Sequence, residues 1–297
     1  MITKREKALF FIQHNLWPRL FFPKKRDSFK ENLFLRKRTD REKNNFSRIS
    51  PIEPWAFIRV KNEIATLKMS LNNIATIFNK GVIGYNECTD GSKEIIQEFC
   101  HNNPSFIAYE YPYRIIPPHS EEYLRKHDYK NTLAAYYNSI LDFIPKNEWL
   151  VKIDVDHFYF KDVMDYSFHL PETENECVMY PRLNLIRDHL NNWRVIDYIN
   201  PHDQWLICNK NLYFKNKARR LENGKIFACE YLVLPKHCKY LYKTECASFH
   251  FPFEKKSRQY AFPIENLQQF QDFIQNADSN EFSSQALDPD ILSQIFS

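Results

Sequence analysis

Glycine is scarce in this sequence, with four residues in 297, and the motifs that depend on glycine are missing. Neither a G-x-G-x-x-G dinucleotide fingerprint nor a Walker A phosphate loop occurs anywhere in the chain. The seven cysteines never stand in a C-x-x-C spacing, which argues against a zinc site and against a full disulfide framework. No run approaches the roughly 18 apolar residues of a membrane span. These absences favour a cytoplasmic protein with reduced thiols.

What the sequence does contain is enough apolar material for a large core. Hydrophobic residues make up 43% of the chain and aromatic residues 16%, which excludes wholesale disorder. Charge is uneven, because residues 1–48 hold 14 Lys/Arg and 5 Asp/Glu, a net charge of +9, whereas the rest of the chain carries −5. We therefore divide the chain into a basic arm at residues 1–50, a body at 51–262, and a C-terminal helix and tail at 263–297.

The basic arm interleaves Lys/Arg clusters with aromatic and aliphatic side chains, a pattern that suits a segment lying at an anionic membrane surface. Each Lys or Arg near such a surface contributes about 1 kcal/mol to binding. A solvated extension whose aromatic side chains pack on the body explains the pattern equally well. Nucleic acid is a weaker candidate partner, because the body is acidic and carries no recognition motif. With the membrane interpretation, the expected location is the cytoplasmic face of the inner membrane.

The body alternates short apolar runs with helical periodicity. The runs predict strands at residues 56–60, 80–85, 105–111 and 149–153. Between them, apolar spacing predicts helices at 64–74, 93–100 and 131–143, the first burying Ile64, Leu67, Leu71 and Ile74. Alternation of this kind is typical of an open α/β sheet with mainly parallel strands flanked by helices. We expect a single domain of this class.

Polar residues follow three of the predicted strands, at 59–63, 86–92 and 154–156. Open α/β sheets bind ligands beyond the carboxyl ends of their strands. The period of two places the carboxylates of Asp154 and Asp156 on one side of the chain. Two close carboxylates form a site for Mg²⁺ or Mn²⁺, which takes its other ligands from water and substrate phosphates. The alternative is a pair of carboxylates that cap a turn.

Three of the four glycines, Gly81, Gly84 and Gly91, lie in one short window around the second predicted strand. In a chain this poor in glycine, the window indicates positive φ angles or the close approach of a ligand. Asn86 and Asp90 would then be able to hydrogen-bond a nucleoside. An ordinary turn from a strand into a helix explains the same window.

His250 is a candidate further along the chain, within the aromatic stretch 249–253 and shortly before Lys255, Lys256 and Arg258. A neutral imidazole can complete a divalent metal site, and nearby cations can neutralise a leaving diphosphate. From the residues alone, a histidine packed in the core is the more frequent explanation for such a position.

Several long strings resemble the bacterial lipooligosaccharide β-1,4-N-acetylgalactosaminyltransferases. They are PWAFIRVKNE at 54–63, GVIGYNECTDGS at 81–92, EFC at 98–100 with PSFI at 104–107, FIPKNEWLVKIDVDH at 143–157, and the shorter FHFPFEKK at 249–256. The resemblance is strong over residues 51–161 and weak from about 160 to 247. It hardly extends to the basic arm.

The resemblance implies a GT-A fold, a UDP-sugar donor, Mn²⁺ or Mg²⁺, and inverting transfer onto a cell-surface glycan. By position, it implies that the nucleoside lies near Arg59, Asn62 and Asp90. It also implies that Asp154 faces the ribose or the metal and that Asp156 is the main metal ligand. His250 would be the downstream ligand, with Lys255 and Lys256 near the diphosphate. The poorly matched middle of the chain is where such enzymes choose their acceptor.

Inverting transfer needs a base that deprotonates the acceptor hydroxyl. Our candidate is Asp203, just before a predicted strand at 206–208, with Glu230 and Asp188 as alternatives. The expected reaction moves GalNAc in β-1,4 linkage from UDP-GalNAc to a galactose-containing lipooligosaccharide, and UDP-glucose or UDP-galactose are alternative donors. Two other classes stay open: a nucleotidyltransferase that uses the same carboxylates, and a non-catalytic membrane adaptor that depends on the basic arm.

Overall fold

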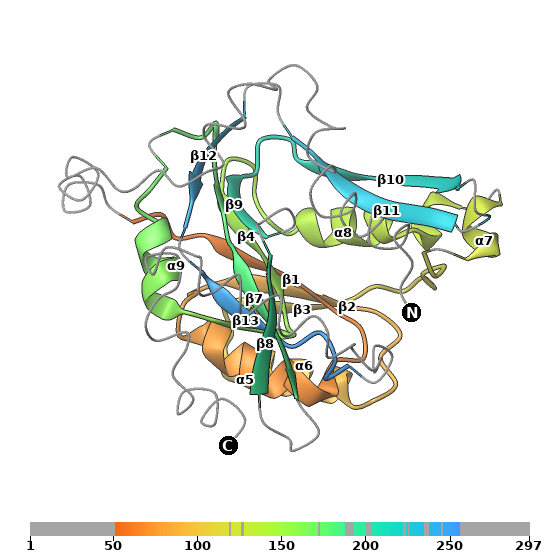
Figure 1. The fold of residues 1–297 in the computed structure, drawn as a ribbon, viewed down its shortest axis with the longest axis horizontal. Helices are drawn as coiled ribbons and strands as arrows, with labels where there is room; N and C mark the ends of the chain where they lie inside the picture. The colour runs from red at the N-terminus through yellow and green to blue at the C-terminus, as the bar shows by residue number, and fades with distance from the viewer. Residues whose placement is uncertain are drawn as a thin grey trace.

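The computed structural model describes residues 51–255, apart from short gaps at 119, 126–127, 172, 188–192, 200–203, 222–223, 225, 235–237 and 245. The basic arm and the segment 263–297 lie outside the described residues, so what we predict for them stays a prediction. Figure 1 shows a central twisted sheet with helices packed on it and a long hairpin to one side.

The central sheet has seven strands in the order β12-β6-β9-β4-β1-β2-β3 (Figure 1). They are β1 (Trp55–Val60), β2 (Gly81–Tyr85), β3 (Phe106–Glu110), β4 (Trp149–Asp154), β6 (Glu176–Met179), β9 (Trp205–Cys208) and β12 (Lys239–Lys243). Strands β4, β1, β2 and β3 run parallel, and β12 is parallel to β6. β9 alone is antiparallel to both of its neighbours, β4 and β6. The predicted mainly parallel α/β sheet is confirmed.

Helices cover both faces of the parallel strands. Alternate residues of a strand point to opposite faces, and in β1 the side chains of Ala56 and Ile58 join one apolar cluster while Phe57 joins another. The first cluster includes side chains of α5 (Ile64–Ala75) and α6 (Ser92–Asn102), and the second includes those of α8 (Leu133–Leu141). Strands buried on both faces need uninterrupted apolar runs, which is why these strands were predictable.

Helix α5 buries Leu67, Leu71 and Ile74 as predicted, but Ile64 is 41% exposed. Ile64 is the first residue of the helix, where the chain has just left the sheet, so it faces outward. The predicted inclusion of Ile64 in the buried face is therefore wrong. The shorter remaining helices are α7 (Glu121–Leu124), the 3₁₀ turn η2 (Tyr129–Asn131) and α9 (Lys161–Ser167).

The clustered glycines allow close packing around β2. A Cβ atom on Gly84 would overlap the side chain of Ile140 in α8, and one on Gly81 would lie 2.7 Å from Cε1 of Phe106. Gly91 precedes α6 with φ of 97°, a conformation that side chains rarely adopt. Gly81 thus serves packing against Phe106 of β3, Gly84 serves packing against α8, and Gly91 serves the turn into α6.

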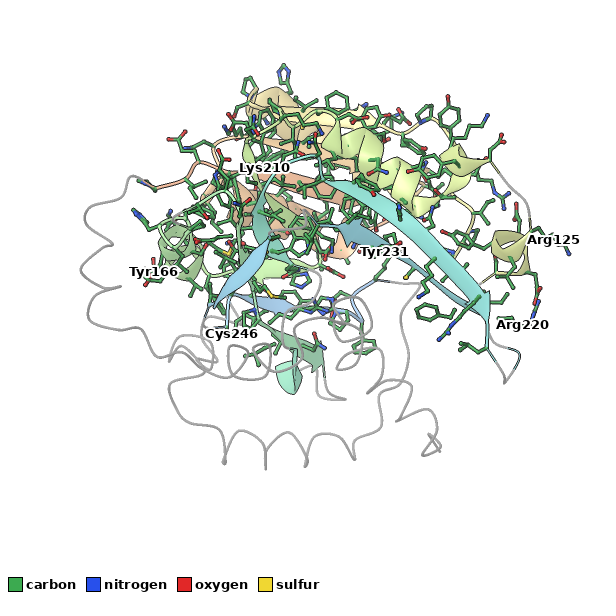
Figure 2. The ribbon with its side chains drawn as sticks, turned by 90° about the horizontal axis from the view of Figure 1, so that it is seen from above. Arg125, Tyr166, Lys210, Arg220, Tyr231 and Cys246 are labelled. Carbon is green, nitrogen blue, oxygen red and sulfur yellow. The ribbon has the colours of Figure 1, made fainter. Side chains whose placement is uncertain are left out.

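A second, four-stranded sheet and a hairpin were not predicted. The second sheet has the order β5-β13-β7-β8, with β5 (His157–Tyr159), β13 (Ser248–His250), β7 (Arg182–Arg187) and β8 (Trp193–Ile199). The hairpin of β10 (Tyr213–Arg220) and β11 (Ile226–Val233) lies beside α8, where Asn138 bonds the backbone N–H and carbonyl of Phe214 at 2.7 and 2.9 Å. Arg220 lies at the far end of the hairpin (Figure 2). It pairs with Glu121 of α7 at 2.6 Å.

None of the helices in the described part of the chain is long and apolar enough to cross a membrane.

Candidate active site

The carboxyl ends of β1 and β4 open onto a pocket of about 260 Å³. Because the two strands pair in parallel with Arg59 opposite Asp154 in the register, both side chains emerge at the same edge of the sheet. The pocket wall also contains Asp156, His157, His250 and Lys255. The chain thus brings residues 59, 154–157 and 250–255 together, as expected for an open α/β sheet.

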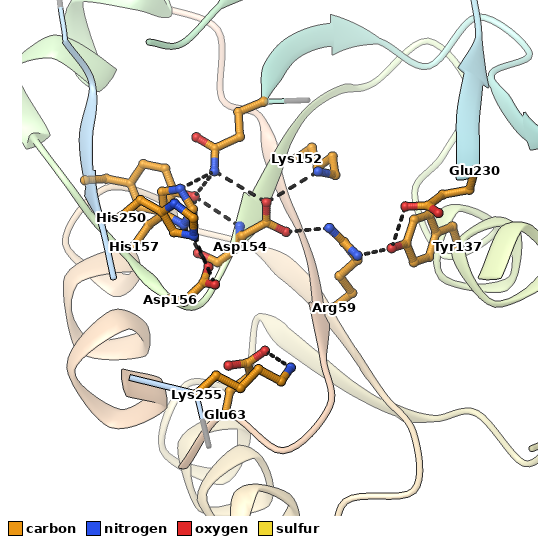
Figure 3. Close-up of polar contacts among 12 residues, drawn as sticks. Arg59, Glu63, Tyr137, Lys152, Asp154, Asp156, His157, Glu230, His250 and Lys255 are labelled. Carbon is orange, nitrogen blue, oxygen red and sulfur yellow. Dashed lines mark hydrogen bonds and ion pairs between the residues drawn. The ribbon is translucent and has the colours of Figure 1, made fainter. Parts of the chain in front are cut away.

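Asp156 and two histidines form a buried polar cluster in this wall (Figure 3). Asp156 Oδ1 lies 2.9 Å from Nδ1 of His157, and Oδ2 lies 3.2 Å from Nε2 of His250. Asp156 is 6% exposed, His157 1% and His250 8%. One ligand atom from each of the three lies within 4.8 Å of the others. This combination of a carboxylate with two imidazoles can hold a divalent metal ion.

Charge within this cluster is set by burial and by the short contacts. Burial by itself raises the pKa of Asp156, but the neighbouring His250 and His157 outweigh it and hold that pKa well below its usual range. Burial lowers the pKa of His250 to about 4, more than the Asp156 carboxylate raises it. At neutral pH the site therefore presents an ionised carboxylate beside a neutral imidazole. These are the protonation states in which both groups bind metals.

Each histidine has a second polar partner. Nδ1 of His250 lies 2.7 Å from Oδ1 of Asn184 on β7. Nε2 of His157 lies 3.0 Å from Nε2 of Gln204, which also contacts the hydroxyl of Tyr159 at 3.1 Å. Both rings are therefore fixed from the side that faces away from Asp156.

Asp154 lies between cations rather than in the histidine cluster. Its Oδ1 accepts a hydrogen bond from Arg59 Nη2 at 2.9 Å, and its Oδ2 lies 3.4 Å from Nζ of Lys152. In the described residues, the group of possible metal ligands consists of Asp156 and the two histidines, and Asp154 is not among them. The D-x-D spacing predicts two carboxylates at one metal; the structure pairs Asp154 with Arg59 and places Asp156 beside the two histidines.

Arg59 links Asp154 to the neighbouring helix and hairpin. Its guanidinium lies 4.6 Å from the centre of the Tyr137 ring and also donates to the Tyr137 hydroxyl. That hydroxyl donates to Oε1 of Glu230 on β11 at 3.1 Å. Figure 3 shows this row of polar groups running from Asp154 to Glu230 along one side of the site.

Lys255 reaches the opposite side of the pocket. Its ammonium group pairs with the carboxylate of Glu63 and donates to the backbone carbonyl of Lys61 at 2.8 Å. Both side chains of the ion pair are largely buried, with 16% exposure for Lys255 and 10% for Glu63. The segment after β13 is thereby held against the turn that follows β1.

Two residues predicted near the nucleoside are not among the pocket-lining residues: Asn62 stands in the turn after β1, and Asp90 stands in the turn between β2 and α6. Oδ1 of Asn62 accepts from the backbone N–H of Thr89 at 2.8 Å. Asp90 accepts from the backbone N–H groups of Ser92 at 3.0 Å and Ile64 at 3.1 Å, so it caps the starts of α6 and α5. Asp203, Asp188 and Lys256 lie outside the described residues.

His157, Asn184 and Gln204 belong to the site but were not predicted. His157 directly follows Asp156, so its position next to the D-x-D pair was a signal that we did not use. Asn184 reaches the site because β7 pairs with β13, and Gln204 because it directly precedes β9 beside β4. No local pattern marks either residue.

The family model described as β-1,4-N-acetylgalactosaminyltransferase (CgtA) matches residues 38–296. No curated protein sequence matches significantly.

Among solved structures, the mannosyltransferase PcManGT from Pyrobaculum calidifontis, in complex with GDP-Man and Mn²⁺, is 15% identical at a TM-score of 0.33. That match covers 47% of this chain and 41% of the mannosyltransferase. HddC from Yersinia pseudotuberculosis is 9% identical at a TM-score of 0.30, covering 52% and 76% of the two chains. The inositol-1-phosphate CTP transferase from T. maritima is 8% identical at 0.29, covering 54% and 72%. These likenesses are too distant to carry a functional argument.

The family match extends over most of the sequence and includes every described site residue. It agrees with the resemblance seen in the strings around Arg59, Asp154 and His250. The chain belongs to the CgtA family of β-1,4-N-acetylgalactosaminyltransferases and is a hexosyltransferase.

Proposed function

We propose that the protein is an inverting, metal-dependent transferase that moves GalNAc from UDP-GalNAc in β-1,4 linkage onto a galactose-containing lipooligosaccharide. The observation that carries the proposal is the buried cluster of Asp156, His157 and His250 in a pocket wall that also holds Arg59 and Lys255. A metal cluster beside fixed cations suits a donor whose leaving group is a diphosphate.

The side chains present fit a divalent metal. Asp156 and His250 would hold it, and a donor set of carboxylate and imidazole favours Mn²⁺ over Mg²⁺, which prefers oxygen ligands. When bound, the ion would neutralise charge on the leaving diphosphate. Arg59 and Lys152 balance the negative charge of Asp154, so this carboxylate does not need a metal ion as a partner. We therefore assign Asp154 to the donor ribose.

The cations around the pocket would bind the rest of the donor. Arg59 is held by Asp154 and Tyr137, which fixes its guanidinium at the carboxyl end of β1. Lys255, with Lys256 after it, would approach the diphosphate by exchanging Glu63 for the phosphate oxygens. We retain Asn62 and Asp90 as nucleoside contacts from the family resemblance.

Asp203 is our proposed catalytic base, which would take the proton of the acceptor hydroxyl as that oxygen attacks the sugar. Asp203 directly precedes Gln204, whose side chain contacts His157 of the metal cluster. This neighbour in the sequence is what supports the assignment. Glu230 is the described alternative, since it lies at the end of the Arg59 and Tyr137 row. Asp188 is the third candidate.

The basic arm at residues 1–50 would hold this acidic body at an anionic membrane on its cytoplasmic face, where a lipid-linked acceptor lies. Deleting residues 1–48 should then release the protein from anionic vesicles. Continued binding of the truncated protein would assign membrane attachment to another segment.

A donor screen tests the proposal. The protein is incubated with Mn²⁺ and each common UDP-sugar, and UDP release is measured with and without a lactose-type acceptor. We expect acceptor-dependent release that is greatest with UDP-GalNAc. Greatest release with UDP-glucose or UDP-galactose would change the donor and keep the transferase. No release from any UDP-sugar would overturn the proposal.

A further inference from the structure

Three polar side chains of the metal cluster and its surroundings stand in one row across the second sheet. In the register, His250 of β13 is opposite His157 of the antiparallel strand β5 and opposite Asn184 of the parallel strand β7. The two imidazole rings stack with centroids 4.3 Å apart and an angle of 13° between their planes. Strand pairing therefore fixes both rings before any ligand binds.

The hydrogen-bond partners of His250 indicate which ring nitrogen carries the hydrogen and which one is left as an acceptor. Oδ1 of Asn184 can only accept, so Nδ1 of His250, 2.7 Å away, carries the hydrogen. In the neutral ring, Nε2 then has no hydrogen and carries a lone pair. The Nε2 atom lies 3.2 Å from Oδ2 of Asp156. Two acceptor atoms that face each other at this distance form a place for a cation.

The same reasoning gives His157 the opposite role. Oδ1 of Asp156 can only accept, so Nδ1 of His157, 2.9 Å away, donates to it. Nε2 of His157 is then an acceptor, and Nε2 of Gln204 donates to it at 3.0 Å. Turning the Gln204 amide over would place its oxygen against the Asp154 carboxylate, 3.5 Å from Oδ2, with acceptor facing acceptor. The orientation of the Gln204 amide therefore agrees with the hydrogen of His157 lying on Nδ1.

We propose that Asn184 and Gln204 are positioning residues that divide the roles of the two histidines. Asn184 directs Nε2 of His250 at the metal, which makes His250 the single imidazole ligand. Gln204 directs Nδ1–H of His157 at Asp156, which holds the carboxylate and keeps His157 from binding the metal. The inference rests on the proposed metal-dependent function and adds residues that the D-x-D pattern does not contain.

Mn²⁺ binding to the full-length protein tests the division of roles, with free Mn²⁺ followed by electron paramagnetic resonance. Asn184→Leu should weaken Mn²⁺ binding about 10- to 100-fold, the usual effect of losing the partner of a ligating histidine. Asn184→Asp keeps the accepting oxygen and should bind close to wild type. His157→Asn keeps a donor near the Nδ1 position and should retain binding, whereas His250→Asn should lose it.

Equal losses in His157→Asn and His250→Asn would overturn the assignment, as would unchanged binding in Asn184→Leu. Thermal unfolding of the metal-free variants shows whether each one is folded. Nuclear magnetic resonance of the metal-free wild type gives a second readout, in which both rings should carry their hydrogen on Nδ1. Hydrogen on Nε2 of either ring would overturn the inference. Wild-type protein that shows these tautomers but binds no Mn²⁺ would overturn the proposed function and leave the hydrogen-bond assignment standing.

Discussion

Arg59 connects the sheet to helix α8, because its guanidinium contacts both Asp154 and Tyr137. Replacing it with methionine keeps the aliphatic length and removes the hydrogen bonds to Asp154 and to the Tyr137 hydroxyl, of which the charge-assisted bond to Asp154 is worth about 1.5–3 kcal/mol. The same change removes a cation–π contact that is worth about 0.5–2 kcal/mol. Lys152, 3.4 Å from the other oxygen of Asp154, remains as a partner for the carboxylate. We therefore expect Arg59→Met to lower the free energy of unfolding by about 2–5 kcal/mol, the sum of these two contributions, without the further cost of a buried charge left alone.

Urea unfolding followed by tryptophan fluorescence measures this loss, and steady-state kinetics measures the functional effect. Arg59→Lys is the matched control, because it keeps the charge but not the forked geometry that spans two partners. It should recover part of the stability and little of the affinity for the UDP-sugar. An Arg59→Met protein within about 0.5 kcal/mol of wild type, the usual range of surface substitutions, would refute the reasoning.

Two further predictions concern packing and the pocket. Gly84→Ala should destabilise the protein by about 1–3 kcal/mol through overlap with Ile140, and the double variant with Ile140→Ala should cost less than the sum of the single changes in urea unfolding. Additive costs would contradict the packing explanation. Lys255→Met should raise KM for the UDP-sugar, whereas Glu63→Gln should lower it by releasing Lys255 from its ion pair. Equal KM values in both variants and the wild type would show that Lys255 does not bind the donor.

The parallel half of the fold was predictable because its strands are buried on both faces. The run at 56–60 is apolar at nearly every position, and the structure places it in β1 between α5, α6 and α8. The second sheet escaped prediction because two of its strands, β5 and β13, have only three residues each. In such short strands, period-two alternation is too brief to distinguish from a loop.

The site was predictable in part, for a related reason. Asp154, Asp156 and Arg59 stand at strand ends, and the ends of parallel strands meet at one edge. Asn184 reaches His250 through strand register, which connects residues 66 positions apart and leaves no trace in local sequence. Asp90 has a structural role that we did not predict, because short polar side chains bond nearby backbone N–H groups and so often serve caps.

The central claim is that a metal held by Asp156 is required for sugar transfer, and one paired measurement tests it most directly. UDP release from UDP-GalNAc, with a galactose-terminated acceptor, is titrated with Mn²⁺ for Asp156→Asn and for Asp165→Asn. Asp165 forms a half-exposed ion pair with Lys161 on α9 and serves as the matched control. We predict Mn²⁺-dependent release in the control and only background release in Asp156→Asn. Equal Mn²⁺-dependent release from the two variants would contradict the account.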